Sequence, residues 1–302
     1  MKLMGRLPHY YETGQHGDGR EKQASMYMQE HAPRGDPDAA LAALEDFHRQ
    51  CKSLLHVGPE KGCHLDDAVR GRAPACALEV GTYIGYSAIR IARLLGDGAC
   101  LFSVEENPDN AGLAEENIAH AGLQDRVTVL RGTTEDWKSK LEHLQVDLIF
   151  LDHKKMLYLG ELLRLESWGM VRKGTVVIAD NIAGLDHSTQ RPKRKKVCNC
   201  QKKGCNYKNY VESPARYQSE VFWGPRDGIE ISVATDPEGV ISPVRKREIT
   251  WTPLHAVQES RDHVDTTANL LQPLSLELQY LRAIGLPCIS RLHAILRPQN
   301  CL

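Results

Sequence analysis

Carboxylate and amide side chains stand at the ends of two short apolar runs in the middle of the chain. Asp152 ends the run Phe150-Leu151-Asp152-His153, and Asp180 and Asn181 end a run that follows about thirty residues later. If both runs are parallel strands, their carboxyl ends meet at one edge of a sheet, where ligands bind. Carboxylate and amide oxygens are ligands that Mg²⁺ or Ca²⁺ prefers. The pattern therefore predicts a metal site of Asp152, Asp180 and Asn181, unless each aspartate merely caps the segment after it.

A lysine stands three residues after the first of these carboxylates. Lys155 is expected beside the metal, where a cation and desolvation depress the pKa of an amine and make it a usable base. The alternative is an ordinary surface lysine at the start of a helix.

A glycine-rich turn follows an earlier apolar run. In Glu79-Val80-Gly81-Thr82-Tyr83-Ile84-Gly85-Tyr86-Ser87, small residues let the backbone approach a ligand, and the next helix offers its free N–H groups. Glu105, roughly 20 positions beyond the glycines, ends the next run and is placed to accept hydrogen bonds from a ribose diol. Together the two features predict an adenosine-containing cofactor, although such glycines also serve turns that bind nothing.

Short apolar runs that alternate with helical patterns must position these residues. The expected strands are Ala75–Val80, Cys100–Val104, Arg126–Leu130, Val146–Leu151, Thr175–Ala179 and Gly228–Thr235. The expected helices are Glu21–His31, a helix from Asp38, Tyr86–Leu95, Pro108–Ala121, Thr134–His143 and Leu157–Trp168. This alternation predicts an α/β fold with a doubly wound Rossmann-like sheet, mostly parallel with an antiparallel last strand, and helices on both faces.

The composition favours a globular cytoplasmic protein. The formal net charge of the 302 residues is -1, which gives no general attraction to nucleic acid or anionic membranes. No apolar stretch approaches the roughly 20 residues of a membrane span, and the first residues lack a secretory signal, so we expect no membrane contact. Nine cysteines, an odd number, do not indicate a disulfide framework. We expect a monomer.

The expected domain organisation has three parts. Residues 1–17 are a loose leader, 18–243 form the α/β domain, and 244–302 are an appendage of unknown order. The domain carries an insert, 188–210, whose segment 191–208 is basic and contains Cys198, Cys200 and Cys205. These cysteines lack an obvious fourth zinc ligand. The basic run suggests nuclear import or nucleic-acid contact, but such runs are usually solvated loops, so we do not expect a nucleic-acid partner.

Several stretches of the chain, from about residue 17 to 236, resemble the catechol O-methyltransferase family, whose soluble enzymes depend on magnesium and S-adenosylmethionine. The matching stretches are GPEKG at 58–62, LEVGTYIGYSAIRIARLL at 78–95, EENPD at 105–109, AGLQDRVTV at 121–129, FLDH at 150–153, LESWGMVRKGTVVIADN at 165–181 and DGIE at 227–230. The resemblance implies a methyltransferase sheet, with S-adenosylmethionine and Mg²⁺ as cofactors.

The resemblance also implies roles for individual residues. Asp152, Asp180 and Asn181 match the magnesium ligands, and Lys155 matches the base that takes the proton from the methylated hydroxyl. Glu220 falls where the family has a glutamate for the second hydroxyl, provided that one residue has been deleted. The positions that match the methyl-donor site are Val57, Glu79, Gly81, Tyr83, Ser87, Glu105, Thr134, Glu135, Asp152 and His153.

The chain departs from the family at the expected acceptor wall. Ser53 and Lys154 stand where the family has tryptophans, and Leu185 stands where it has a proline. We predict O-methylation of a catechol-type substrate, as in catecholamine metabolism. The departures leave two alternatives open: the same machinery acting on a non-catechol phenol, and a catalytically weak S-adenosylmethionine-binding or adaptor protein that acts through its basic insert.

Overall fold

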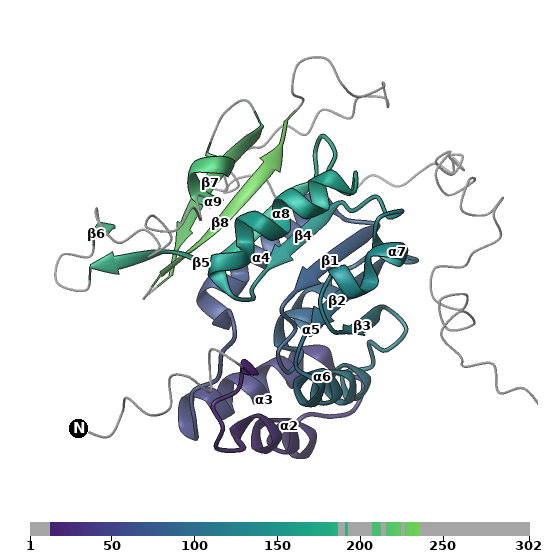
Figure 1. Cartoon of the computed structure of the whole chain (residues 1–302). Helices are drawn as coiled ribbons and strands as arrows, with labels where there is room; N and C mark the ends of the chain where they lie inside the picture. Colours follow the sequence, from purple (N-terminus) through teal and green to yellow (C-terminus); the bar gives the residue numbers. More distant parts are fainter. Residues whose placement is uncertain (1–12, 187–190, 193–206, 213–215, 225–226, 236–302) are drawn as a thin grey trace, which may run out of the picture. The chain divides into compact units, whose positions relative to one another are not determined.

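A mixed β-sheet forms the centre of the molecule (Figure 1). Its strand order is β3-β2-β1-β4-β5-β8-β7, and a short strand, β6, pairs with the end of β5. The strands are β1 Cys76–Val80, β2 Cys100–Glu105, β3 Val127–Arg131, β4 Leu148–Leu151, β5 Val176–Asp186, β6 Arg191–Pro192, β7 Tyr217–Trp223 and β8 Asp227–Ala234. Strands β1 to β5 pair in parallel, whereas β8 runs antiparallel to β5 and β7 antiparallel to β8. The predicted doubly wound sheet with an antiparallel end is confirmed.

Helices cover both faces of this sheet. Helices α4, α5 and α6 lie on one face with α2 and α3 packed outside them, and α8 and α9 lie on the other (Figure 1). Their bounds are α2 Arg20–His31, α3 Pro37–Gln50, α4 Gly58–Arg72, α5 Tyr86–Ala92, α6 Pro108–His120, α7 Lys138–Leu141, α8 Tyr158–Ser167 and α9 Tyr207–Val211. Two 3₁₀ turns, Glu135–Trp137 and Lys155–Leu157, precede α7 and α8.

The computed structural model describes residues 13–186, 191–192, 207–212, 216–224 and 227–235. The tail 244–302, the zinc-candidate cysteines and most of the insert 188–210 lie outside these ranges. Residues 13–17 are inside them and are held by the domain: Asn107 donates to the Thr13 carbonyl, and Gln15 donates to the Asn110 side chain. Residues 13 and 15, in the last part of the predicted leader, thus contact the loop and helix at Asn107 and Asn110. Among the described helices, none is long and apolar enough to cross a membrane.

Local sequence explains where several helices begin. Asp36 caps α3 by accepting the Ala39 N–H, with Pro37 at the first helical position. Asn107 caps α6 in the same way, ahead of Pro108. Helix α4 was not predicted, because its segment GPEKGCHLDDAVRGR is polar and has weak apolar periodicity.

Candidate active site

The turn between β1 and α5 brings two strand ends into close contact. Gly81 has φ 102°, and a Cβ placed there would lie 2.6 Å from the carbonyl oxygen of Asp152 and 2.9 Å from the His153 nitrogen. Only glycine lets the end of β1 approach the end of β4 this closely. Tyr83 and Gly85, also at positive φ, complete the turn that directs the N-terminus of α5 toward this edge.

Glu79 is fully buried at the end of β1. Its carboxylate accepts hydrogen bonds from the hydroxyls of Ser103 and Ser87. Burial raises the pKa of Glu79 to about 7, despite these two donors. Its Oε1 atom is buried and has no hydrogen-bond partner among the described residues.

Glu105 at the end of β2 is held by the backbone. Its Oε2 accepts the N–H of Tyr83 at 2.8 Å, and its Oε1 accepts the N–H of Asn107 at 2.9 Å. Burial raises the pKa of this carboxyl. Since each carboxylate oxygen has a further lone pair, Glu105 can still accept from a diol.

The remaining donor-site positions lie around the same edge. Val57 is buried at the start of α4, and both ring nitrogens of His153 are buried without a hydrogen-bond partner in the described structure. Burial lowers the pKa of His153 to about 4, so the ring is neutral. Farther along, Thr134 donates to Glu161 at 2.6 Å, and Glu135 pairs with Arg164 at 3.0 Å.

Among the expected metal ligands, Asp152 directly follows β4, and Asp180 and Asn181 follow Ala179, the last residue of β5 that pairs with β4. The predicted strand end at Ala179 is wrong, because β5 continues to Asp186 after an irregularity in its pairing with β8 between Ala179 and Ala183. Burial raises the pKa of Asp152 well above its usual range, and the negative charge of Asp180 raises it further. Asp180 is 1% exposed, and Asn181 adopts a left-handed backbone with φ 55°. The described residues contain no group of three or more His, Cys, Asp and Glu side chains that could hold a metal. Two mutually repelling buried carboxylates with an adjacent amide nevertheless form an oxygen donor set that fits Mg²⁺.

Two charged residues at this edge were missed by the sequence analysis. The Nζ of Lys61, on α4, lies 2.6 Å from Asp180 Oδ1 and 2.7 Å from Asp227 Oδ1. Asp227 Oδ2 in turn accepts from Asn181 Nδ2 at 2.9 Å. Burial lowers the pKa of Lys61, but the two carboxylates outweigh it and the net pKa is raised. The motifs GPEKG and DGIE contain both residues, but no local signal indicates their contact.

Lys155 opens the turn between β4 and α8. Desolvation lowers the pKa of its ammonium group, and the carboxylates of Asp227 and Asp180 offset only part of this effect. A lowered pKa favours the neutral amine, which is the form that a lysine base requires.

Comparison with known proteins places this arrangement in a family. Residues 78–182 match the model of a methyltransferase domain. The chain is 39% identical to catechol O-methyltransferase B of Danio rerio over 212 residues, which cover 68% of this chain and 75% of the fish protein. The chain belongs to the catechol O-methyltransferase family. It is thus an S-adenosylmethionine-dependent O-methyltransferase.

Other relatives extend this similarity. A probable O-methyltransferase of Mycobacterium tuberculosis is 43% identical over 178 residues, covering 56% of this chain and 76% of that protein. The catechol O-methyltransferase of Bos taurus is 41% identical over 170 residues, 55% of this chain and 62% of the bovine protein. An O-methyltransferase structure from Bacillus cereus, in complex with SAH, has a TM-score of 0.54 at 23% identity, covering 70% of this chain and 97% of that one. This last likeness concerns the fold.

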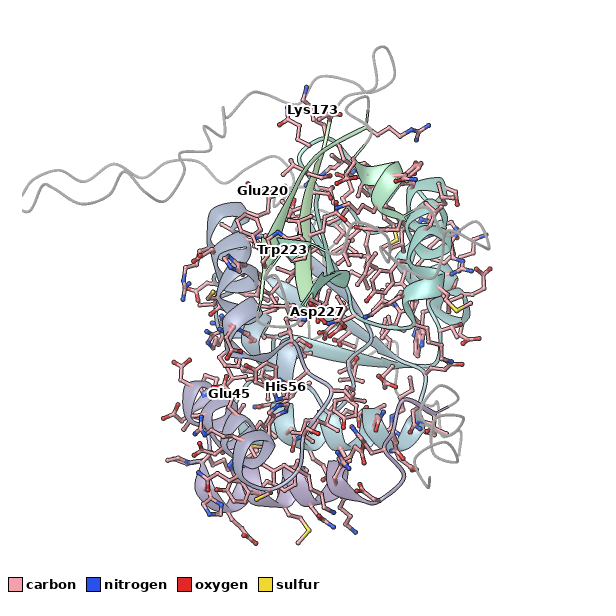
Figure 2. The ribbon with its side chains drawn as sticks, turned by 90° about the vertical axis from the view of Figure 1, so that its left-hand side faces the viewer. Glu45, His56, Lys173, Glu220, Trp223 and Asp227 are labelled. Carbon is pink, nitrogen blue, oxygen red and sulfur yellow. The ribbon has the colours of Figure 1, made fainter. Side chains whose placement is uncertain are left out.

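The structure does not bring Glu220 to the Lys155 edge. Glu220 pairs with Ile231, which pairs with Ile178, so Glu220 lies level with a residue of β5 that precedes Asp180. Figure 2 shows it on the Lys173 side of Trp223 and Asp227. It shares a strand face with Phe222, whose ring stacks on His64 of α4, whereas Lys155 precedes α8 on the opposite face. The last residue of β7, Trp223, pairs with Gly228 beside Asp227, and Gly224 follows it. The role of Glu220 toward the second hydroxyl stays a prediction.

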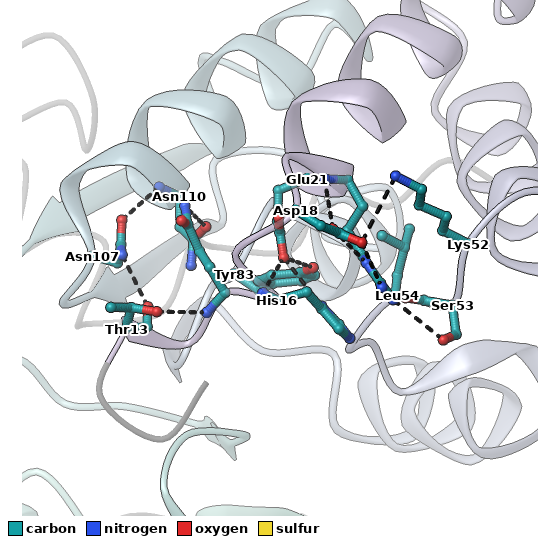
Figure 3. A network of polar contacts seen from close by, with 12 residues as sticks. Thr13, His16, Asp18, Glu21, Lys52, Ser53, Leu54, Tyr83, Asn107 and Asn110 are labelled. Atoms are coloured by element: carbon teal, nitrogen blue, oxygen red, sulfur yellow. Dashed lines mark hydrogen bonds and ion pairs between the residues drawn. The ribbon is translucent and has the colours of Figure 1, made fainter. Parts of the chain in front are cut away.

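The departures from the family's acceptor wall are also visible in the structure. The carbonyl of Ser53 accepts from Arg20 at 2.7 Å, within the polar network around Asp18 (Figure 3). Lys154 pairs with Glu106 at 3.1 Å. Leu185 lies in β5, where its backbone pairs with Pro192. The large apolar side chains exposed near the edge are Met156, Leu157 and Trp223.

Proposed function

We propose that this family member transfers a methyl group from S-adenosylmethionine to one hydroxyl of a catechol-type substrate, with Mg²⁺ and Lys155. The observation that carries the proposal is the convergence at one sheet edge of two buried carboxylates, an amide and a lysine of lowered pKa. The relatives named catechol O-methyltransferase support it.

Two aspartates and an asparagine at this edge are the proposed metal ligands. Asp152, Asp180 and Asn181 would hold the ion through oxygen atoms. When bound, magnesium lowers the pKa of a chelated hydroxyl and fixes its oxygen. Asp227 keeps the Asn181 amide oriented, because its Oδ2 accepts from the amide nitrogen and leaves the amide oxygen free to face a cation.

Lys155 would move the proton. Its Nζ must be neutral to accept the hydroxyl proton, and desolvation favours the neutral amine. The proton then resides on Nζ as an ammonium, which the nearby carboxylates stabilise. Glu79, Gly81, Tyr83, Ser87 and Glu105 would hold the methyl donor on the other side, so that most of the rate enhancement comes from positioning.

A non-catechol phenol is the second candidate acceptor. Ser53 and Lys154 supply no aromatic surface where the family has tryptophans, and Glu220 lies away from the edge. Both observations weaken the recognition of a flat vicinal diol without changing the proposed metal and base. Cytoplasmic localisation and the monomeric state stay predictions.

The experiment is a direct methyl-transfer assay with a panel of catechols and simple phenols, with and without Mg²⁺. Asp152→Ala should reduce turnover at least as much as the loss of a general base, about 10²–10⁴-fold, because the buried donor set then lacks a charged oxygen ligand. Binding of S-adenosylmethionine, measured by calorimetry, should persist. The exposed Asp97→Ala is the control. Near-normal turnover of Asp152→Ala in magnesium would refute the metal assignment.

A further inference from the structure

We propose that Lys61 is a positioning residue that weakens metal binding, by placing an ammonium on the carboxylate of Asp180. The inference rests on the proposed function, since it assumes that Asp180 is a magnesium ligand. It concerns a residue of α4 that the family motifs did not assign any role.

The ammonium is shared between two carboxylates. Lys61 is 8% exposed, and its Nζ lies 2.6 Å and 2.9 Å from the two oxygens of Asp180. It also lies 2.7 Å from Asp227 Oδ1. Because the other oxygen of Asp227 accepts from Asn181, Lys61 is linked to both expected ligands in β5, one directly and one through Asp227.

The backbone at Gly224 lies against the stem of Lys61. A Cβ on Gly224 would lie 2.7 Å from Lys61 Cγ, and the Gly224 N–H donates to the Asp227 carbonyl at 2.8 Å. The backbone at Gly224 therefore packs directly against the aliphatic stem of Lys61, next to Asp227.

The Lys61 ammonium has opposite effects with and without the metal. Without metal, it offsets the repulsion between the buried carboxylates of Asp152 and Asp180, so the metal-free fold is stabilised. With metal, two cations share the Asp180 carboxylate and repel each other, so the affinity for the metal is lower than the carboxylates alone would provide. The chain thus keeps a folded site when metal is scarce and releases the metal readily.

The test measures metal binding rather than turnover. Mn²⁺ binding to the full chain is followed by electron paramagnetic resonance for the wild type, Lys61→Met and Lys61→Gln. We expect both variants to bind Mn²⁺ at least tenfold more tightly, while the Tm of the metal-free protein falls. Saturating Mn²⁺ should then raise the Tm of the variants more than that of the wild type. Lys138→Met, which removes a surface lysine, is the matched control and should change neither value.

A purely structural lysine would give a different result. If Lys61→Met lowers the Tm and leaves Mn²⁺ affinity unchanged or weaker, the inference is overturned while the metal site stands. If the wild type binds no Mn²⁺ and Asp180→Asn changes nothing, the metal site itself is refuted, and the inference with it. Asp227→Asn covers the case in which the Lys61 variants fail to fold. It removes one carboxylate partner of Lys61 and also changes the acceptor of the Asn181 amide, so both effects should weaken Mn²⁺ binding, by at least fivefold in all. Unchanged binding contradicts the inference.

Discussion

Two parts of the sheet edge both bury carboxylates but stabilise them differently: the proposed donor side, at β1 and β2, and the proposed metal side, at β4, β5 and β8. Glu105 accepts two backbone N–H groups, from Tyr83 and Asn107, that lie close to it in the turns at this edge. Asp180 instead faces another carboxylate and is balanced by Lys61, 119 residues away in the chain. Backbone N–H donors stabilise the Glu105 carboxylate without a ligand. The facing carboxylates of Asp152 and Asp180 repel each other and need a cation to balance them.

The largest expected effect is a difference in kcat between alanine substitutions at two adjacent lysines, Lys155 and Lys154. Lys155→Ala should lower kcat by about 10²–10⁴-fold, because it removes the proposed general base. Lys154→Ala breaks only an exposed ion pair with Glu106 and should change kcat by less than about threefold. Steady-state kinetics across pH measures both. Equal effects of the two substitutions would contradict the assignment of the base.

The donor side should show a pH dependence of stability that comes from Glu79. Its pKa is about 7 in the folded protein against 4.5 ordinarily, so the folded state binds protons more tightly. The stability from this group is fully present below about pH 4.5 and is lost as pH rises through about 7, a change of at most about 3 kcal/mol.

Urea unfolding at pH 4.5 and pH 8 tests this effect. Glu79→Gln should lose less free energy of unfolding between the two pH values than the wild type, because glutamine does not ionise. The exposed Glu116→Gln should behave like the wild type. An identical pH response of Glu79→Gln and wild type would show that Glu79 is not the source.

The acceptor wall should respond more weakly. An aromatic contact contributes about 0.5–1.5 kcal/mol, so Ser53→Trp or Lys154→Trp should lower the KM for neutral catechols roughly two- to tenfold, with kcat less affected. The sequence also suggests that Lys154 favours acidic acceptors. Its pairing with Glu106 reduces that preference. If the KM values fall but the ratio of KM for acidic acceptors to KM for neutral acceptors stays the same, the charge of Lys154 does not set acceptor preference. If the KM values do not change, the missing aromatic side chains do not limit acceptor binding.

The smallest effect is expected at Glu220. Because its side chain shares a strand face with Phe222 and lies level with Ile178 of β5, Glu220→Gln should change kcat and KM by less than about twofold. Competition kinetics with a catechol and its monohydroxy analogue measures this. A tenfold loss specific to the catechol would show that Glu220 does reach the acceptor.

The sequence by itself determined the elements of both regions and the residues at their ends. Buried runs such as Leu148–Leu151 alternate with helices, and capping residues such as Asn107 mark helix starts, because these signals depend on near neighbours. Glu105 ends β2 and Asp152 directly follows β4, as predicted, and parallel strands bring their carboxyl ends to one edge. Asp180 instead lies within β5, which continues to Asp186, but it follows Ala179, the last residue that pairs with β4.

Only the tertiary structure decided which charges meet. Lys61 and Asp227 are 166 residues apart, and nothing near either residue indicates that α4 and β8 bring them together. Nor does sequence spacing determine which face of β7 Glu220 occupies, because a shift of one residue moves a side chain to the other face of a strand. Long-range register and helix packing, which local patterns do not encode, therefore set the electrostatics of the metal side.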